Sequence, residues 1–267
     1  KGYIYKGKKA VYWCPHCETA LAEAEIEYKD RKSPSIYVKF PAKNIKGLGP
    51  EGVDQSKLFA VIWTTTPWTI PANQYISVNP KFTYVWVHNP DADEYYLMNK
   101  ELAPAALADC GIGNYEFAGR EMTGAEWELA EFMHPWASYN RTVYVLEGNH
   151  VTLDAGTGCV HTAPGHGVED FEVCVNHYPQ VPVIVPVDDG GYLTEEAGKE
   201  FAGLKVWAAN KVILEHIKQS GHLMGVQHIT HQYPHCWRCH HPIIFRATEQ
   251  WFCSIDKFRE EAYKAID

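Results

Sequence analysis

Two Cys-x-x-Cys pairs near opposite ends of the 267-residue chain constrain its fold more than any other feature. Cys14 and Cys17 lie in AVYWCPHCETA, and Cys236 and Cys239 lie in THQYPHCWRCHHP. Short runs of strand-forming residues flank each pair, which is typical of a zinc knuckle. Four thiolates from two such turns match the tetrahedral preference of Zn²⁺. We therefore expect the four cysteines to bind one structural zinc ion with no open coordination position.

A shared ion would require the chain to leave and return at the same place, as a domain inserted into another domain does. We predict a zinc-ribbon and connecting region formed by residues 1–34 and 230–267, and a central domain over residues 35–229. The alternative is two unrelated pairs of reduced thiols. The nearby histidines, which could replace a cysteine as ligand or stay exposed, are His16, His235, His240 and His241.

The composition indicates the cellular environment and the partners that the protein can have. The other four cysteines are scattered, which indicates a reducing, cytoplasmic location rather than a disulfide framework. No apolar run reaches membrane-spanning length, and no signal segment opens the chain, so we expect no membrane contact. The chain begins with Lys rather than Met, which suggests a piece of a longer polypeptide. A net charge of −9 disfavours general nucleic-acid binding, so any such contact must be local or helped by another domain.

Between the knuckles, short β-branched and aromatic runs outnumber helical patterns. We predict an α+β fold with a mainly β, barrel-like core and peripheral helices. The expected helices are 101–109, a helix from about residue 167, 206–219 closed by Gly221, and the start of one at 257–267. Residues 41–56 are expected to form a surface loop. The expected strands are 11–13, 36–40, 59–63, 75–78, 84–88, 95–98, 116–120, 142–146 and 181–187.

Residues 156–171 read GTGCVHTAPGHGVEDF and predict a tight loop that leads into a helix. Its glycines permit positive φ or close approach of a ligand to the main chain. Asp170 should lie in the first helical turn, where the helix dipole favours an ionised carboxylate. His161 and His166 stand upstream on the loop. The alternative is an ordinary helix-capping loop with solvated histidines.

Residues 61–74 read VIWTTTPWTIPANQ, an apolar strand followed by a proline-broken loop. Such a loop would leave hydroxyls and backbone N–H groups pointing outward. Trp63 and Trp68 offer flat faces for stacking, and Asn73 adds an amide. The alternative is a plain strand and turn, since Thr and Trp favour sheets. The hydroxyl-bearing residues are Thr64, Thr65, Thr66 and Thr69.

Together these two stretches closely resemble the editing domain of isoleucyl-tRNA synthetases, the connective peptide inserted into the class I catalytic domain. The resemblance runs essentially end to end and includes both knuckles and the closing residues 249–252, EQWF. The valyl and leucyl relatives instead carry TTRP and PAHD in the two motifs. The HIGH and KMSKS signatures of class I synthetases are absent from this chain, so the resemblance implies a hydrolytic domain that cannot activate an amino acid.

The resemblance implies hydrolysis of valine wrongly esterified to isoleucine tRNA. The implied partners are the 3′ end of mischarged tRNA(Ile), its valine moiety and the rest of the synthetase. Asp170 would hold the α-ammonium group, and His161 would exclude isoleucine by size. Thr65 and its neighbours would hold the ester and an attacking water, while Trp68 and Asn73 would support the loop or contact the terminal adenosine. The residues expected to shape the wall opposite His161 are Trp63, Thr64, Thr65 and Thr66.

Two rival functions remain open at this point. His161, His166 and Asp170 have the composition of metal ligands, so a zinc-dependent metallohydrolase is one alternative. The other is a non-catalytic insertion that only docks tRNA. A covalent threonine nucleophile is not expected, because no base is identifiable beside the threonines.

Overall fold

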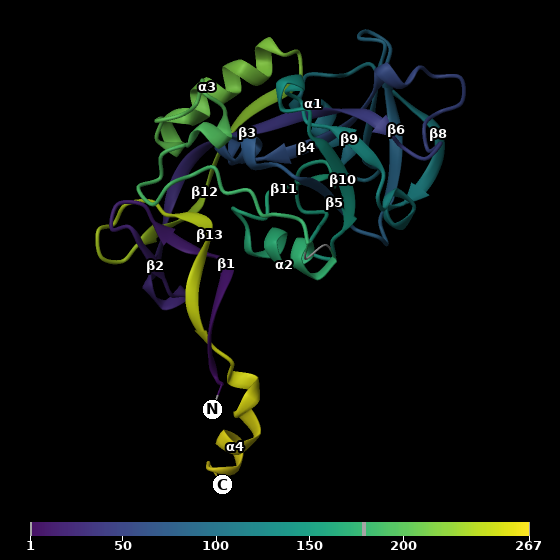
Figure 1. Cartoon of the computed structure of the whole chain (residues 1–267). Helices are drawn as coiled ribbons and strands as arrows, with labels where there is room; N and C mark the ends of the chain where they lie inside the picture. The colour runs from purple at the N-terminus through teal and green to yellow at the C-terminus, as the bar shows by residue number, and fades with distance from the viewer. Residues whose placement is uncertain (1, 178–179, 267) are drawn as a thin grey trace.

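The computed structural model describes residues 2–177 and 180–266, and strands dominate it (Figure 1). Four α-helices are described: α1 Ala103–Asp109, α2 Val168–His177, α3 Val206–Gln219 and α4 Arg259–Lys264. A 3₁₀ helix, η3, covers Pro67–Ala72. The strands are β1 Ile4–Cys14, β2 Thr19–Leu21, β3 Ile26–Asn44, β4 Leu58–Thr64, β5 Tyr75–Val78, β6 Thr83–Asn89, β7 Glu94–Asn99, β8 Glu116–Thr123, β9 Glu131–Met133, β10 Thr142–Glu147, β11 Val160–Thr162, β12 Leu223–Cys236 and β13 Ile244–Cys253.

The described strands form a small sheet of order β13-β1-β2 and a large one of order β12-β3-β9-β10-β5-β11-β4-β7-β6-β8. An additional β3–β4 pairing connects two non-neighbouring members of the large sheet. The pairings β3–β9–β10–β5–β11–β4–β3 therefore form a closed circuit. A mixed, sheet-dominated fold with few helices agrees with the sequence analysis. The barrel-like core, expected from the many short strands, stays a prediction; the closed circuit is compatible with it, because a barrel requires a sheet that closes on itself.

Helix α3 covers the upper side of the molecule in Figure 1, over β3 and β12. Its inward face is fully buried at Val206, Ala209, Ile213 and Ile217, as the helical spacing predicts. Val212, expected on the same face, is 40 % exposed. The helix is followed by Gly221 at φ +76°, a left-handed conformation that suits glycine at a helix end.

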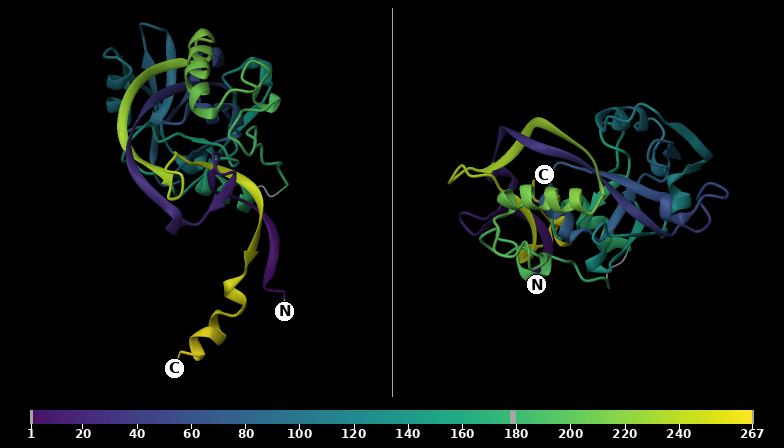
Figure 2. Two further views of the ribbon diagram at one scale, coloured as in Figure 1. Left: turned by 90° about the vertical axis from the view of Figure 1, so that its left-hand side faces the viewer. Right: turned by 90° about the horizontal axis from the view of Figure 1, so that it is seen from above.

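The two ends of the described chain lie together on a ribbon below the main body (Figure 1). This ribbon is the antiparallel pair β1–β13, in register from Ile4 opposite Cys253 to Trp13 opposite Ile244. A second long pair, β3–β12, curves around the molecule (Figure 2, left). Both strands of that pair run without a break across the expected limits at 34/35 and 229/230. The two-region division stays a prediction.

The apolar run 181–187 is not the strand that its composition predicts. Only Val187 makes an isolated bridge, to Leu193. The Gln74 side chain replaces a strand partner: its amide donates to the Pro182 carbonyl at 2.9 Å, and its oxygen accepts from the Ile184 N–H at 2.9 Å. Proline at 182 also removes a ladder donor.

Two other boundaries differ from expectation. Strand β3 continues to Asn44, so the expected surface loop begins later than Pro41. The terminal helix α4 occupies only part of the expected range 257–267, and Asp267 lies outside the described residues. In the described part of the chain, every helix is too short or too polar to span a bilayer.

Candidate functional site

Sheet pairing brings the two motif stretches together although they are far apart in sequence. Strand β11 lies between β4 and β5 in the large sheet. It pairs parallel to β4 through Val160 and Trp63, and antiparallel to β5 through His161 and Ile76. The end of the threonine-bearing strand and the start of the histidine loop are thus neighbours.

The two motifs line one pocket of about 300 Å³. From the expected set it contains Thr64, Thr66, Trp68, His161 and Asp170. Its far wall comes from β12, β13 and the segment just before β13, which the sequence analysis assigned to the zinc-ribbon region. These strands could not be recognised as pocket walls, because their approach depends on tertiary packing. The remaining lining residues are Thr69, Ala163, His166, His231, Gln232, Tyr233, Pro234, Ile243, Ile244 and Phe245.

Not all expected site residues face this pocket. Trp63 and Thr65 line a neighbouring pocket of about 370 Å³, which also contains His150. Thr64 and His161 line both pockets and so form part of the partition between them. We call the first the Asp170 pocket and the second the Thr65 pocket.

The stretch after β4 differs from the expected open loop. Residues 67–72 form η3, and every one of them is buried. Its backbone donors are used: the Thr69 N–H donates to the Thr66 carbonyl at 3.1 Å, and the Trp68 N–H donates to Asn210 Oδ1 at 2.9 Å. Asn210 belongs to α3, so a helix far along the chain caps this turn. At Trp68 and Thr69 the prediction of free N–H groups is therefore wrong.

His161 is held at both ring nitrogens. Asn73 Nδ2 lies 2.8 Å from His161 Nδ1 and also donates to the Tyr75 carbonyl at 3.0 Å. The amide must donate, so Nδ1 accepts and Nε2 carries the hydrogen. Nε2 then donates to Thr69 Oγ1 at 2.9 Å, whose own hydrogen goes to the Thr66 carbonyl at 2.7 Å. Burial lowers the pKa of His161 to about 3, so the ring is neutral.

Asn73 itself is completely buried behind His161 and lines neither of the two pockets. Its place in the structure is that of a support for the histidine ring. The supporting role that the sequence analysis gave as one of two possibilities is therefore the one its contacts match.

Asp170 lies in the first turn of α2, as expected. Its Oδ2 accepts a hydrogen bond from the Ala163 N–H at 2.8 Å. A Cβ on Gly167 would stand 2.8 Å from the carboxyl carbon, so this position requires glycine. Burial raises the pKa of Asp170 to about 6, against the lowering effect of the Ala163 hydrogen bond. The carboxylate is ionised at neutral pH, but protonation is close.

His166 contributes a feature that the sequence did not reveal. Its Nδ1 donates to the Phe245 carbonyl at 2.9 Å, because a carbonyl can only accept. Burial lowers the pKa of His166 to about 4 and keeps the ring neutral. Nε2 is therefore a bare acceptor, and it is buried without a hydrogen-bond partner among the described residues.

The four knuckle cysteines meet as expected. Their sulfur atoms all lie within 4.8 Å of one another, and Sγ of Cys14 and Cys239 are 3.5 Å apart. Cys14 and Cys236 are fully buried, so the protein shields that side of the cluster from solvent. This donor set and spacing suit a tetrahedral metal ion. His16 and His241 stack on each other beside the cluster with ring centroids 4.2 Å apart.

The described residues do not support a metal centre in the Asp170 pocket. Among them, the groups of three or more donors close enough for one ion are the four cysteines and the trio His16, Cys239 and His241, in which both histidines are exposed. Both nitrogens of His161 are already engaged by Asn73 and Thr69. The metallohydrolase alternative therefore loses its expected ligand set.

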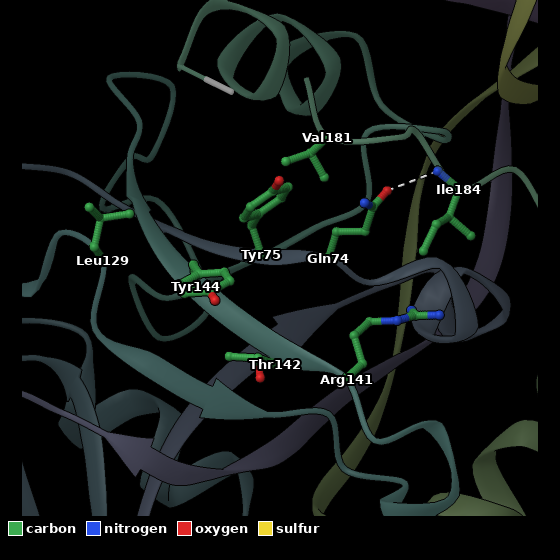
Figure 3. Close-up of a pocket in the computed structure, with 8 residues that line it drawn as sticks. All are labelled: Gln74, Tyr75, Leu129, Arg141, Thr142, Tyr144, Val181 and Ile184. Carbon is green, nitrogen blue, oxygen red and sulfur yellow. Dashed lines mark hydrogen bonds between the residues drawn. The ribbon is translucent and has the colours of Figure 1, made fainter. Parts of the chain in front are cut away.

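A third pocket, of about 320 Å³, has Gln74, Arg141 and Ile184 among its lining residues (Figure 3). Arg141 on its wall donates from Nη1 to the carbonyls of Pro71 and Asn73, at 2.8 and 2.6 Å. The arginine thus holds the backbone that positions His161. No local sequence signal marks Arg141 or Asn210 for these supporting roles.

Known proteins resemble this chain in sequence over its whole length. The family model described as tRNA synthetases class I (I, L, M and V) matches residues 1–267. The isoleucine–tRNA ligase of Caldicellulosiruptor saccharolyticus is 54 % identical over 268 residues, and that of Moorella thermoacetica is 52 % identical over 267. Each match covers 100 % of this chain but only 28 % and 27 % of the relative.

Solved structures share the fold at low identity. The crystal structure of GlLeuRS-CP1 has a TM-score of 0.55 and 17 % identity, and covers 72 % of this chain and 98 % of its own. The editing domain of the P. knowlesi cytosolic leucyl-tRNA synthetase has a TM-score of 0.54 and 12 % identity, with coverages of 72 % and 96 %. These two structures share the fold of about 72 % of this chain.

Proposed function

Because the chain belongs to the class I tRNA synthetases (I, L, M and V), we propose that it hydrolyses aminoacyl esters of tRNA, with mischarged Val-tRNA(Ile) as its substrate. The isoleucine-specific relatives support the choice of tRNA, and the editing-domain fold supports hydrolysis. The partners in this proposal are the 3′ end of tRNA(Ile) and the rest of an isoleucine–tRNA ligase in the cytoplasm.

The observation that carries the proposal is the meeting of Asp170, His161 and the threonine motif in one pocket of amino-acid size. An ionised carboxylate inside a half-closed pocket binds an ammonium group through charge-assisted hydrogen bonds. An aminoacyl ester offers such a group next to the bond to be cleaved, whereas a plain ester does not. Asp170 therefore selects amino acids by their α-ammonium group.

We place the valine side chain against His161. The ring of His161 is fixed by Asn73 and Thr69, so it cannot turn aside for a larger side chain. A rigid wall discriminates by shape, because every additional methylene must displace well-packed atoms. Isoleucine, with one more methylene, would be excluded.

The ester would then lie near the partition formed by Thr64 and His161, with the terminal adenosine toward the Thr65 pocket. Trp63 lines that second pocket and offers an aromatic face to the nucleoside. Thr65 supplies a hydroxyl on the same side. This placement gives Trp63, Thr64 and Thr65 roles without a covalent threonine intermediate.

For the cysteine cluster we propose a structural Zn²⁺ bound by Cys14, Cys17, Cys236 and Cys239. The ion would join the turn after β1 to the turn after β12 and so fix the base of the ribbon. Burial raises the pKa of the Cys14 thiol, and a bound cation would supply the charge that stabilises its thiolate.

The direct test is deacylation of Val-tRNA(Ile) and Ile-tRNA(Ile) by the chain and by Asp170→Asn. The asparagine keeps the volume and the acceptor for the Ala163 N–H but removes the charge. We expect the chain to cleave the valyl ester and spare the isoleucyl ester, and the variant to lose roughly 10²-fold or more in rate. Binding of tRNA without cleavage of either ester would instead identify a docking module.

A further inference from the structure

We infer that His166 is a further catalytic residue, whose bare Nε2 holds the attacking water beside the acyl carbon; the inference rests on the proposed hydrolysis. The starting point is the fixed tautomer of the ring. Nδ1 carries the hydrogen that is donated to the Phe245 carbonyl at 2.9 Å, so a neutral ring leaves Nε2 unprotonated.

The unpaired state of Nε2 calls for an explanation. Buried polar atoms in folded proteins almost always have a partner, and a lone acceptor costs about 1–3 kcal/mol. His166 is only 9 % exposed, and its Nε2 has no partner among the described residues. His166 lines the Asp170 pocket, but Nε2 itself is sealed from it, so a small displacement of the neighbouring pocket wall is needed before a donor in the pocket completes the hydrogen bond.

The ring is also held in place. The carbonyl of Gly165, the preceding residue, accepts a hydrogen bond from the Ala247 N–H at 2.8 Å. Strand β13 is therefore hydrogen-bonded to two adjacent residues of the loop. A Cβ at Gly165 would stand 2.1 Å from the Ile184 carbonyl oxygen, which makes the close packing dependent on glycine. Trp68 meets the His166 ring edge-on, with centroids 4.9 Å apart. These contacts keep the ring and its Nε2 in one orientation.

Charge decides which donor the nitrogen accepts from. The α-ammonium group gains most from the ionised carboxylate of Asp170, since charge-assisted hydrogen bonds are the stronger ones. A neutral imidazole is left for a neutral donor, and water is the one that hydrolysis requires. Burial lowers the pKa of His166 to about 4, so Nε2 stays available throughout the neutral range.

The step balances without any other reactant. The water oxygen bonds to the acyl carbon, and the bond from that carbon to the ribose oxygen breaks. The water proton held at Nε2 of His166 ends on the ribose oxygen, which leaves as a hydroxyl. The products are free valine and tRNA with an intact 3′ end, and the ring returns to its starting tautomer.

Two substitutions separate this role from a structural one. In His166→Asn the side-chain amide can replace Nδ1 and donate to Phe245, but nothing reaches the position of Nε2. In His166→Gln the longer side chain places its polar end near the position of Nε2 and gives up the bond to Phe245. His228→Ala, an exposed histidine on β12, is the matched control.

We expect His166→Asn to lose roughly 10²-fold or more in single-turnover deacylation of Val-tRNA(Ile) while its melting temperature stays near that of the unsubstituted chain. His166→Gln should keep more activity than His166→Asn, and His228→Ala should be unchanged. The reverse order, with an active His166→Asn and an inactive His166→Gln, would show that deacylation depends only on the hydrogen bond to the Phe245 carbonyl. That result would overturn the inference.

Binding supplies the second readout. The probe is adenosine with valine joined to its 2′ position by an amide in place of the ester, titrated by calorimetry. Unchanged affinity in His166→Asn supports a water-holding role, whereas a loss of affinity as large as the loss of rate would assign Nε2 to the α-ammonium group and overturn the water assignment. A chain that binds this probe but cleaves no valyl ester would refute the proposed function itself, while an active chain with an active His166→Asn variant would refute only the inference.

Discussion

At the scale of single residues, we propose that one group of the site selects by charge and another selects by shape. Asp170 has one carboxylate oxygen fixed by the Ala163 N–H. His161 has no free ring nitrogen, because Asn73 and Thr69 use both. The first can capture an ammonium group, and the second can only limit space. The two functions can therefore be altered separately.

Removing the His161 ring should relax the size limit. We predict that His161→Ala cleaves Ile-tRNA(Ile), with the ratio of valyl to isoleucyl rates falling by about tenfold or more, a change of about 1.4 kcal/mol in discrimination. Asn73→Ala should have a smaller effect in the same direction, since the ring stays but loses its support. Deacylation rates on both esters measure this. If His161→Ala still spares isoleucine, another residue forms the wall.

The raised pKa of Asp170 makes a prediction about pH. Activity should fall as pH drops through about 6, because the carboxylate that holds the ammonium becomes protonated. His161 and His166, with pKa values lowered to about 3 and about 4, should not titrate in that range. A pH–rate profile of valyl-ester cleavage measures the transition, and a flat profile from pH 8 to pH 5 would contradict it.

The raised pKa of Asp170 also predicts how the folding stability of the chain depends on pH. A carboxyl group with a higher pKa folded than unfolded costs stability once ionised, so the penalty is absent below the unfolded value near 4 and complete above about 6. At pH 7 the melting temperature of Asp170→Asn should therefore lie roughly a few degrees above that of the unsubstituted chain. Near pH 3.5 the two melting temperatures should be the same. Thermal unfolding at the two pH values tests this. Equal melting temperatures at pH 7 would show that the carboxyl is not destabilised by burial.

The sequence predicts the residues of the site better than their contacts. The place of Asp170 at a helix start follows from local composition, whereas His161 lies beside the threonine motif only because β11 pairs with β4 and β5. The tautomer of His166 could not, because it depends on a carbonyl of β13. Residue type limits what a side chain can do, but its partners decide which of those roles remain.

At the scale of secondary-structure elements, helix α3 supports the short helix η3. Asn210 of α3 accepts the Trp68 N–H at 2.9 Å, so Trp68 is fixed from a segment that contributes nothing to the pocket itself. A Thr- and Pro-rich stretch read alone resembles an open loop. Only this distant amide and the surrounding core make it a buried turn.

Breaking this contact should disturb the site while leaving the fold in place. We predict that Asn210→Ala lowers valyl-ester cleavage several-fold and costs about 1–2 kcal/mol of stability, the cost of leaving one buried N–H unpaired. Lys211→Ala, at the adjacent exposed position, is the control and should change neither. Rates and chemical denaturation of both variants test the prediction. Equal rates in the two would show that η3 keeps its shape without the helix.

Most elements follow from periodicity, since the predicted strands at 59–63, 75–78 and 84–88 lie within β4, β5 and β6. The strand predicted at 181–187 does not form. The Gln74 side chain, instead of a neighbouring strand, makes hydrogen bonds to the Pro182 carbonyl and the Ile184 N–H. Hydrophobicity reports burial, but it does not report which group supplies the hydrogen bonds.

At the scale of the whole molecule, the cysteine cluster and the Asp170 pocket are connected through β13. That strand begins soon after Cys239, and its residues Phe245 and Ala247 hold the loop of Gly165 and His166. Loosening the knuckles should therefore affect a site to which no cysteine side chain of the cluster contributes.

We predict that Cys14→Ser removes about one zinc per chain, lowers the melting temperature by roughly 5–10 °C, and lowers valyl-ester cleavage through the displaced β13. Cys253→Ser, an exposed cysteine on the same strand, is the control and should keep metal, stability and rate. Metal analysis, thermal unfolding and deacylation test the three parts. Full activity in a zinc-free Cys14→Ser chain would show that the ribbon does not position the loop, and two zinc ions per unsubstituted chain would point to a second metal centre.

The pairing of Ile4 with Cys253 has a practical consequence for engineering. A short flexible peptide could join these two positions into a covalent ring, and the ring could be opened instead in the exposed turn at residues 51–52, which line neither the Asp170 pocket nor the Thr65 pocket. Such a circularly permuted chain would keep its strand order in space while changing which segment leaves the ribosome first.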